Sequence, residues 1–188
     1  CPDSYQYDPL DPVPTMGGRI QMPEVQEAGV KDQSVVEERE DVLVYTTPRL
    51  DKAVKIAGPV EANLFISSSA VDTDFTAKLV DVEPNGYCGN VTEGILRARY
   101  RDSMEEASFM QPGNVYEVSV DLWHVAHTFK PGHRIRLEIS SSSFPRWDRN
   151  PNTEVQPCDA SVGDMKIATN TIYHESDKES FLSLHVVE

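Results

Sequence analysis

The chain has 188 residues, of which 39% are hydrophobic and 26% charged, so it is long enough to form a globular domain with a sizeable core. Its formal net charge of −14 excludes nucleic acid and anionic membrane surfaces as partners, because both require a basic face. No window approaches the roughly 18 consecutive apolar residues that a membrane helix needs. No secretory leader is visible, and three widely spaced cysteines without a CxxC pair favour neither a disulfide framework nor a zinc site. We therefore expect a reducing, cytoplasmic setting.

The first forty residues predict an extended arm. Three prolines stand within residues 7–15, and proline fixes φ and removes a hydrogen-bond donor, so this segment is expected to be irregular. Gly17 and Gly18 then permit a tight turn, and residues 23–40 are rich in charge without a clear period. We expect residues 1–40 to be an arm or linker and residues 41–188 to be the folded domain.

From residue 41 onward, apolar and polar side chains alternate with the period of two that is typical of strands buried on one face. The expected strands are residues 42–47, 60–66, 75–82, 96–101, 116–122, 135–139, 169–173 and 181–187. In the fourth of these, the alternation predicts that Ala98 and Tyr100 face the core while Arg99 faces solvent. Turn signals such as Pro84-Asn85-Gly86 and Lys130-Pro131-Gly132 separate the strands. The pattern predicts an all-β fold, a galactose-binding-like jelly-roll β-sandwich of two antiparallel sheets with long loops.

No serine hydrolase motif is present. An α/β-type hydrolase holds its nucleophile on a G-x-S-x-G elbow, and no two glycines of this chain lie four apart. The run from Ser140 to Ser143 ends a predicted strand, and a nucleophile there would need an adjacent base. Hydroxyls that satisfy the end of a strand and the following loop explain the run better. We therefore expect no catalytic residue in this chain.

Two clusters invite comparison with metal sites. His124 and His127 are three apart on a strand, so they point to opposite faces, and His133 follows in a Pro-Gly-His turn. Ordinary loop or packing histidines are favoured over a metal site, which needs converging ligands. Asp72 and Asp74 precede a strand, where capping of a turn is favoured over a calcium site. We expect neither a metal nor a cofactor.

The segment from residue 144 to 152 has an unusual composition, with Phe144, Arg146, Trp147, Asp148 and Arg149 in one loop. Arginine stacks on tryptophan and forms bidentate pairs with aspartate. Such residues are enriched where one protein surface meets another. A loop of internal ion pairs explains the composition equally well, and both interpretations stay open at this point.

Seven blocks of the sequence match a known family in family order and cover nearly the whole chain: YDPLDPVPTMGG (7–18), DVLVYTTPRL (41–50), SSSAVDTDFTAKLVDVEPNG (67–86), EGILRARYRD (93–102), PGNVYEVSVDLW (112–123), FKPGHRIRLEISSSSFPRWDRNPNT (129–153) and SFLSLHVV (180–187). On these blocks the chain resembles the C-terminal domain of the cocaine-esterase/NonD hydrolase family, which is related to X-prolyl dipeptidyl-peptidases and α-amino-acid ester hydrolases. One departure is Glu154, where the family usually has glycine.

The resemblance implies a jelly-roll domain that follows an α/β-hydrolase domain with a helical cap. In the family the catalytic Ser, Asp and His lie upstream of the YDP…PVP segment, so none transfers to a position here. The implied parent is a serine hydrolase that acts on esters, amides or X-Pro peptides through an acyl-enzyme. The arm is implied to lie along the hydrolase cleft, with wall residues at Arg19, Ile20, Gln21 and Met22. We therefore expect a non-catalytic accessory domain that packs on the α/β-hydrolase domain of its own parent chain and helps to shape its substrate cleft.

A docking domain should expose an apolar or aromatic patch, which we expect near Tyr5, Tyr7, Ile20, Met22, Phe144 and Trp147. Burial of these side chains within the domain's own core would contradict this assignment. Such a patch would also favour self-association into a homo-oligomer. The alternative function is a carbohydrate-binding jelly-roll module in which an exposed Trp123 or Trp147 stacks on a sugar, and this rests on analogy of fold alone.

Overall fold

The computed structural model describes residues 2–20, 24 and 27–187. Strands dominate these residues, and the helices are short. No described helix has the length and apolar character needed to cross a bilayer. The elements in chain order are β1 (Asp3–Tyr7), α1 (Ser34–Glu37), β2 (Leu43–Thr46), β3 (Val54–Ser68), β4 (Asp74–Val82), β5 (Cys88–Arg97), the 3-10 helix η1 (Ala98–Tyr100), β6 (Tyr116–Phe129), β7 (Arg134–Ser140), the 3-10 helix η2 (Val162–Asp164), β8 (Ala168–Glu175), β9 (Lys178–Glu179) and β10 (Phe181–Val187).

Two antiparallel sheets face each other across the core. One sheet has the order β2-β7-β4-β5, and the other has the order β1-β8-β3-β10, with β6 paired to β3 and β9 to β8. Apolar side chains from both sheets form one buried cluster that includes Leu64, Phe75, Leu79, Val120 and Ile139. Strand β4 lies between β5 and β7, and eight of its nine residues are buried, as expected for a central strand. The predicted all-β jelly-roll sandwich is confirmed.

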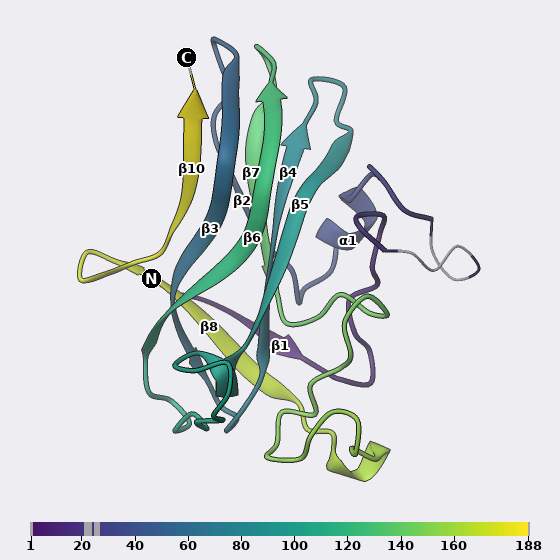
Figure 1. Ribbon diagram of the computed structural model, residues 1–188, viewed down its shortest axis with the longest axis vertical. Coiled ribbons are helices and arrows are strands. Elements are labelled where there is room, and N and C mark those ends of the chain that lie inside the picture. Colours follow the sequence, from purple (N-terminus) through teal and green to yellow (C-terminus); the bar gives the residue numbers. More distant parts are fainter. Residues whose placement is uncertain (1, 21–23, 25–26, 188) are drawn as a thin grey trace.

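The two sides of the sandwich differ in how the sheets meet. Strands β5 and β6 come together on one side, where the Thr92 hydroxyl donates to the backbone oxygen of Leu122. A Cβ on Gly94 would overlap the backbone oxygen of Asp121 and lie 2.7 Å from its carbonyl carbon, so only glycine fits. On the other side, β2 ends one sheet and β10 lies at the outer edge of the other (Figure 1). The sandwich is therefore closed along β5 and β6 and open between β2 and β10.

The N-terminal segment is more tightly integrated than predicted. Residues 3–7, expected to belong to an arm, form β1 and pair with residues 168–172 of β8. Tyr5 and Tyr7 are 3% and 0% exposed, so they are part of the core. The alternation Tyr-x-Tyr is short and precedes a proline-rich segment, so it does not indicate a strand by itself. The strand with which it pairs lies 165 residues away and cannot be identified from local sequence. Residues 3–7 therefore belong to the sandwich.

The chain leaves β5 earlier than the alternation predicts. Residues 98–100 form η1 rather than a strand, and Arg99 is 0% exposed instead of facing solvent. The cause is Asp72, whose carboxylate accepts hydrogen bonds from both the backbone N–H and the Nε of Arg99, each at 2.8 Å. Because the buried Asp72 carboxylate binds two donors of Arg99, the backbone turns at this residue. The strand prediction for residues 98–101 is therefore wrong.

A buried group of charges lies on the face of the four-stranded sheet that α1 covers. Lys78 donates to the Oε1 of Gln33 at 2.7 Å and lies 3.2 Å from the Oε2 of Glu138. Glu138 is 3% exposed, and its Oε1 has no hydrogen-bond partner among the described residues. Burial, together with the nearby carboxylate of Glu37, raises the pKa of Glu138 to about 7 against the opposing effect of Lys78.

Glu138 should make the stability of the domain depend on pH near neutrality. Between pH 4.5 and about 7, Glu138 keeps its proton in the folded chain but loses it in the unfolded chain. The contribution of Glu138 to the free energy of unfolding therefore falls as pH rises through this range. We expect Glu138→Gln to gain about 2 kcal/mol relative to the wild type between about pH 5 and pH 8. Urea titrations across this range measure the difference. Glu117→Gln, at an exposed position of β6, is the matched control and should show a constant difference; a constant difference for Glu138→Gln as well would contradict the raised pKa.

Candidate functional site

The two segments singled out in the sequence lie side by side at one end of the four-stranded sheet. The backbone N–H of Thr15 donates to the oxygen of Phe144 at 2.8 Å, and the N–H of Phe144 donates to the oxygen of Val13 at 2.9 Å. This parallel bridge joins the arm to the loop that follows β7. Segments about 130 residues apart in the sequence therefore form one surface.

The serine run after β7 holds the arm in this position. Ser141 bonds the Tyr5 hydroxyl at 2.8 Å, Ser142 accepts from the N–H of Val13 at 2.9 Å, and Ser143 bonds the Thr15 hydroxyl at 3.0 Å. Ser140 donates to the backbone oxygen of Asp41 at 2.7 Å. All four serines are buried, and their hydrogen bonds within the described chain involve no histidine. The structural interpretation of the run is confirmed.

Glu93 of β5 connects the two segments. Its carboxylate forms an ion pair with Arg146, and its backbone oxygen accepts from Arg19 Nη2 at 3.2 Å. Glu93 is 4% exposed, so the carboxylate is held rather than free to move. Gly18 passes directly over this pair with a φ of +79°, and a Cβ there would run into the Glu93 carboxylate. The glycine pair predicted as a turn is thus required by close approach as well as by conformation.

Each of these arginines stacks on a tryptophan. The guanidinium carbon of Arg19 lies 5.0 Å from the ring centre of Trp123, and that of Arg146 lies 4.5 Å from the ring centre of Trp147. Trp123 is 58% exposed, so much of its ring remains in contact with solvent. We call these four residues the Arg/Trp surface. Because both stacks are anchored on β5 through Glu93, the surface is preorganised.

Trp123 owes its exposure to an irregularity in β6. The pairing between β3 and β6 shifts register between Pro59 and Glu61, and Trp123 has a φ of +71°. Its backbone N–H is held by the Oδ1 of Asp121 at 2.7 Å. A β-bulge redirects a side chain in this way, and a bulky residue in the left-handed region is strained. Strain retained at an exposed tryptophan marks the position as a functional candidate.

The rest of the loop is tied down by internal contacts. Asp148 forms an ion pair with Arg97, while Arg149 donates to the oxygen of Pro9 at 3.2 Å. The guanidinium carbon of Arg149 also lies 5.3 Å from the ring centre of Phe144, which is 40% exposed. The charges of the loop are paired internally, as one interpretation of its composition expected. Phe144 and the Arg146–Trp147 stack still reach the surface, as the interface interpretation expected.

The predicted docking patch is partly wrong. Ile20 is 4% exposed, and Tyr5 and Tyr7 are buried as described above, because β1 and the turn after Gly18 pack into the domain's own core. Gln21 and Met22 lie outside the described residues. Of the predicted patch, only Phe144 and Trp147 among the described residues reach the surface. Trp123 and Glu93 were missed as parts of this surface, because nothing in the local sequence marks a bulge or a shared anchor.

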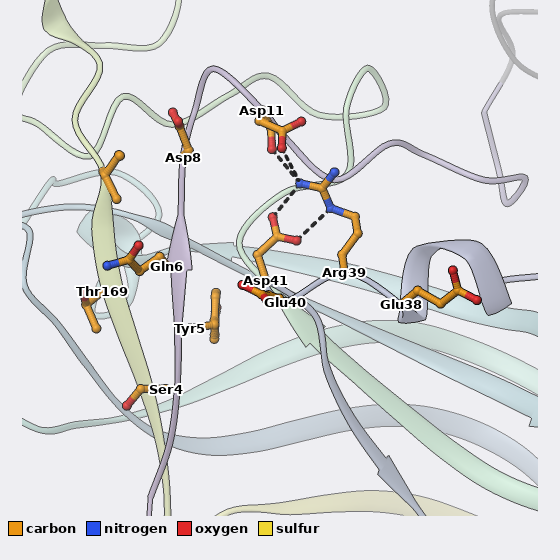
Figure 2. Close-up of a pocket in the computed structure, with 11 residues that line it drawn as sticks. Ser4, Tyr5, Gln6, Asp8, Asp11, Glu38, Arg39, Glu40, Asp41 and Thr169 are labelled. Carbon is orange, nitrogen blue, oxygen red and sulfur yellow. Dashed lines mark hydrogen bonds and ion pairs between the residues drawn. The ribbon is translucent and has the colours of Figure 1, made fainter.

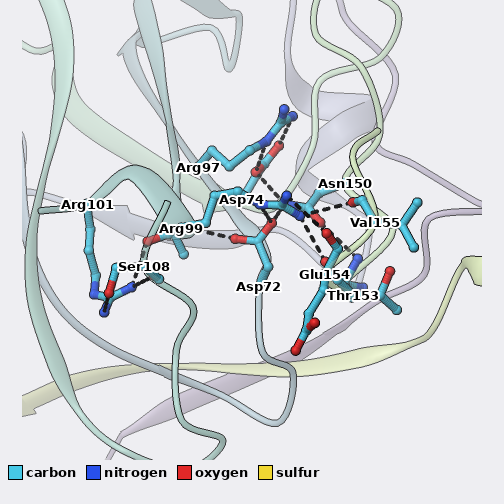
Figure 3. Close-up of polar contacts among 12 residues, drawn as sticks. Asp72, Asp74, Arg97, Arg99, Arg101, Ser108, Asn150, Thr153, Glu154 and Val155 are labelled. Carbon is cyan, nitrogen blue, oxygen red and sulfur yellow. Dashed lines mark hydrogen bonds and ion pairs between the residues drawn. The ribbon is translucent and has the colours of Figure 1, made fainter. Parts of the chain in front are cut away.

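The aspartates around the start of β4, Asp72 and Asp74, are paired with arginines rather than arranged for a cation. Asp72 binds Arg99, and Asp74 binds Arg97 through two bonds of 3.0 Å each. The amide of Asn150 donates to both carboxylates, at 2.7 Å and 2.8 Å (Figure 3). The guanidinium of Arg99 also donates to three backbone oxygens, those of residues 153–155. This group fastens the 144–155 loop to the sandwich and so positions the Arg/Trp surface.

Two of the three clustered histidines meet at one carboxylate. His127 Nε2 lies 2.9 Å from one oxygen of Asp81, and His133 Nδ1 lies 2.8 Å from the other. His124 is exposed and does not join them. Among the described residues, no three histidine, cysteine or carboxylate side chains are grouped in a way that could hold a metal. The Asp81 contacts join β4 to β6 and to the turn before β7, which is a packing role.

An open groove of about 870 Å³ lies between β1 and residues 38–41. Figure 2 shows Arg39 between Asp41 and Asp11, with its Nε 2.7 Å from the Oδ1 of Asp41. The remaining charged residues of the lining are acidic, namely Asp8, Glu38 and Glu40. The groove is therefore negative.

Residues 2–183 match the family described as the X-Pro dipeptidyl-peptidase C-terminal non-catalytic domain. The chain belongs to this family. Cocaine esterase from Rhodococcus sp. (strain MB1 Bresler) is 42% identical over 186 residues, which are 99% of this chain and 32% of that protein. The family resemblance predicted from the sequence blocks is thus confirmed.

Solved structures show the same domain within longer chains. An aminopeptidase from a marine sediment Thaumarchaeota archaeon superposes with a TM-score of 0.91 at 33% identity, covering 100% of this chain and 33% of that one. An α-amino acid ester hydrolase gives the same TM-score and identity, covering 99% and 32%. The chain therefore spans about a third of the length of these relatives, and the family to which it belongs is described as non-catalytic.

Proposed function

We propose that this domain packs against an α/β-hydrolase domain of its own parent chain through the Arg/Trp surface and helps to shape the substrate cleft. The observation that carries the proposal is the pair of Arg–Trp stacks anchored on Glu93, with Trp123 strained and 58% exposed. Tryptophan and arginine dominate the binding energy of protein interfaces. The names of the relatives, an esterase, an ester hydrolase and an aminopeptidase, support a parent that is a hydrolase acting on ester or peptide bonds, and another relative, from Mycobacterium bovis, is named a putative serine esterase.

A binding measurement tests the surface. The 188-residue chain is mixed with the separately produced hydrolase part of the same gene product, and the dissociation constant is measured by calorimetry. We expect Trp123→Ala to weaken binding about tenfold or more. Phe181→Ala is the matched control, because Phe181 is an aromatic residue of similar exposure, 54%, on β10 at the open side of the sandwich. Equal affinities for the wild type and Trp123→Ala would show that the interface lies elsewhere.

An activity measurement tests the absence of catalysis. The 188-residue chain alone should not turn over p-nitrophenyl acetate or an X-Pro p-nitroanilide, because the buried serines are committed to the arm. Turnover that survives removal of contaminating hydrolases would contradict the proposal. Sugar binding on a glycan array that disappears in Trp123→Ala would instead support the carbohydrate-binding alternative.

A further inference from the structure

A second feature of the molecule lies far from the Arg/Trp surface, at the open side of the sandwich. A pocket of about 320 Å³ enters between β2 and β7 of one sheet and β3, β8 and β10 of the other. Its floor is formed by Leu64, Leu137 and Ile172, which are at most 8% exposed. An apolar cavity of about 150 Å³ is enough to bind benzene. This pocket therefore has room for a ring-sized apolar group in contact with the core.

The polar groups of the mouth are oriented by one carboxylate. The Tyr45 hydroxyl donates to the Oδ2 of Asp3 at 3.0 Å, and His174 Nε2 lies 3.1 Å from the same oxygen. Burial and the Asp3 carboxylate raise the pKa of Tyr45, so its hydroxyl keeps its proton. The Tyr45 proton is directed to Asp3, and His174 Nε2 lies 3.1 Å from the Tyr45 oxygen, so one of the two lone pairs of that oxygen is left for an incoming group.

The mouth also presents aromatic rings, and its described lining contains no lysine or arginine. Tyr45 and His174 pack edge to face with ring centres 5.1 Å apart, and Phe181 also lines the entrance. Two arginines contact the β2 wall from outside the lining: Arg136 is ion-paired with Glu37 and donates through Nε to the Thr46 hydroxyl at 2.8 Å, and Arg134 donates to the backbone oxygen of Thr47. Acceptors, aromatic rings and a carboxylate are the groups that recognise organic ammonium ions.

We propose that this pocket binds a small organic cation, with an apolar ring or branched chain inserted between the sheets and a protonated amine at the Tyr45, His174 and Asp3 mouth. The net charge of −14 favours the approach of such a cation. The volume of the pocket favours a small molecule over a protein segment as the ligand. The pocket lies at the lower limit of volume for ligand sites, and it ends at a buried floor.

The test uses three probes that share one ring, namely benzylammonium, benzyl alcohol and benzoate, titrated into the 188-residue chain by NMR. We expect a dissociation constant of about 1 mM or tighter for benzylammonium, with binding about tenfold weaker for benzyl alcohol and weaker still for benzoate. Shift changes should centre on Leu182, Tyr45 and Ile172. Binding of benzoate as tight as that of benzylammonium, or no binding of any probe, would overturn the proposal.

Variants distinguish the contribution of the carboxylate at the mouth from that of the apolar part of the pocket. Asp3→Asn should reduce the affinity for benzylammonium to that for benzyl alcohol, and Phe181→Ala should weaken all probes by a similar factor. Asp51→Asn removes one charge at an exposed position outside the pocket and should change nothing. Shift changes in the acidic groove of Figure 2 instead of the pocket would show non-specific attraction of the cation and overturn the assignment.

Discussion

Replacing Asp72 with asparagine is expected to lower the free energy of unfolding by about 3–5 kcal/mol. Asp72 and Arg99 are both 0% exposed, and the carboxylate accepts from the Nε and N–H of Arg99 and from Asn150. An asparagine must turn its own NH₂ towards one of these donors, and it leaves the guanidinium without its counter-charge. Urea denaturation of the 188-residue chain, with unchanged m-value, measures the loss.

The same change in an exposed ion pair provides the control. Asp102 pairs with Arg101 at 3.2 Å, and its side chain is 65% exposed. We expect Asp102→Asn to lower the free energy of unfolding by no more than about 1 kcal/mol, since water screens such pairs. Similar losses for the two variants would mean that the buried pair contributes no more than a surface pair.

Gly94→Ala is expected to destabilise the domain by about 3 kcal/mol or more, because the new methyl group meets backbone rather than a mobile side chain. The Cβ would overlap the backbone oxygen of Asp121, so β5 and β6 would have to separate along the closed side of the sandwich. Thermal unfolding should show the loss as a clear decrease in Tm.

Gly163→Ala is the matched control for this substitution. A Cβ on Gly163 meets only the Ser161 hydroxyl oxygen at 3.6 Å, which is ordinary van der Waals contact. We expect its effect to stay within about 0.5 kcal/mol, as for other surface substitutions. A wild-type Tm for Gly94→Ala would indicate that the two strands are not in the close contact described here.

The serine run illustrates what can and cannot be predicted from local sequence. That Ser140 to Ser143 satisfy a strand end follows from their position and from the missing base. Their partners, Tyr5, Val13 and Thr15 among them, lie about 130 residues away. Hydrogen bonds across such a separation form only when the sheets assemble. The local sequence therefore predicts that the serines form structural hydrogen bonds but does not identify their partners.

The Arg/Trp surface shows the same division. Arg146 and Trp147 were candidates because of their residue types and stack as expected, whereas Arg19 was a candidate through the family resemblance and its stack on Trp123 was not foreseen. Trp123 completes the surface through a bulge, and Glu93 anchors it through a long-range ion pair. Tyr5 and Ile20 were misassigned because an aromatic or aliphatic residue looks the same in sequence whether it faces a partner or its own core.

The sequence by itself determined the class of this protein: alternation with period two indicates strands, and seven ordered blocks identify the family, whose C-terminal domain is described as non-catalytic. Tertiary structure alone decided which charges are buried, where the sandwich closes, and which arginines and tryptophans share a surface. The physical reason is that periodicity acts between neighbours in the chain, whereas ion pairs such as Asp72–Arg99 and contacts such as Gly94–Asp121 form between residues that only folding brings together.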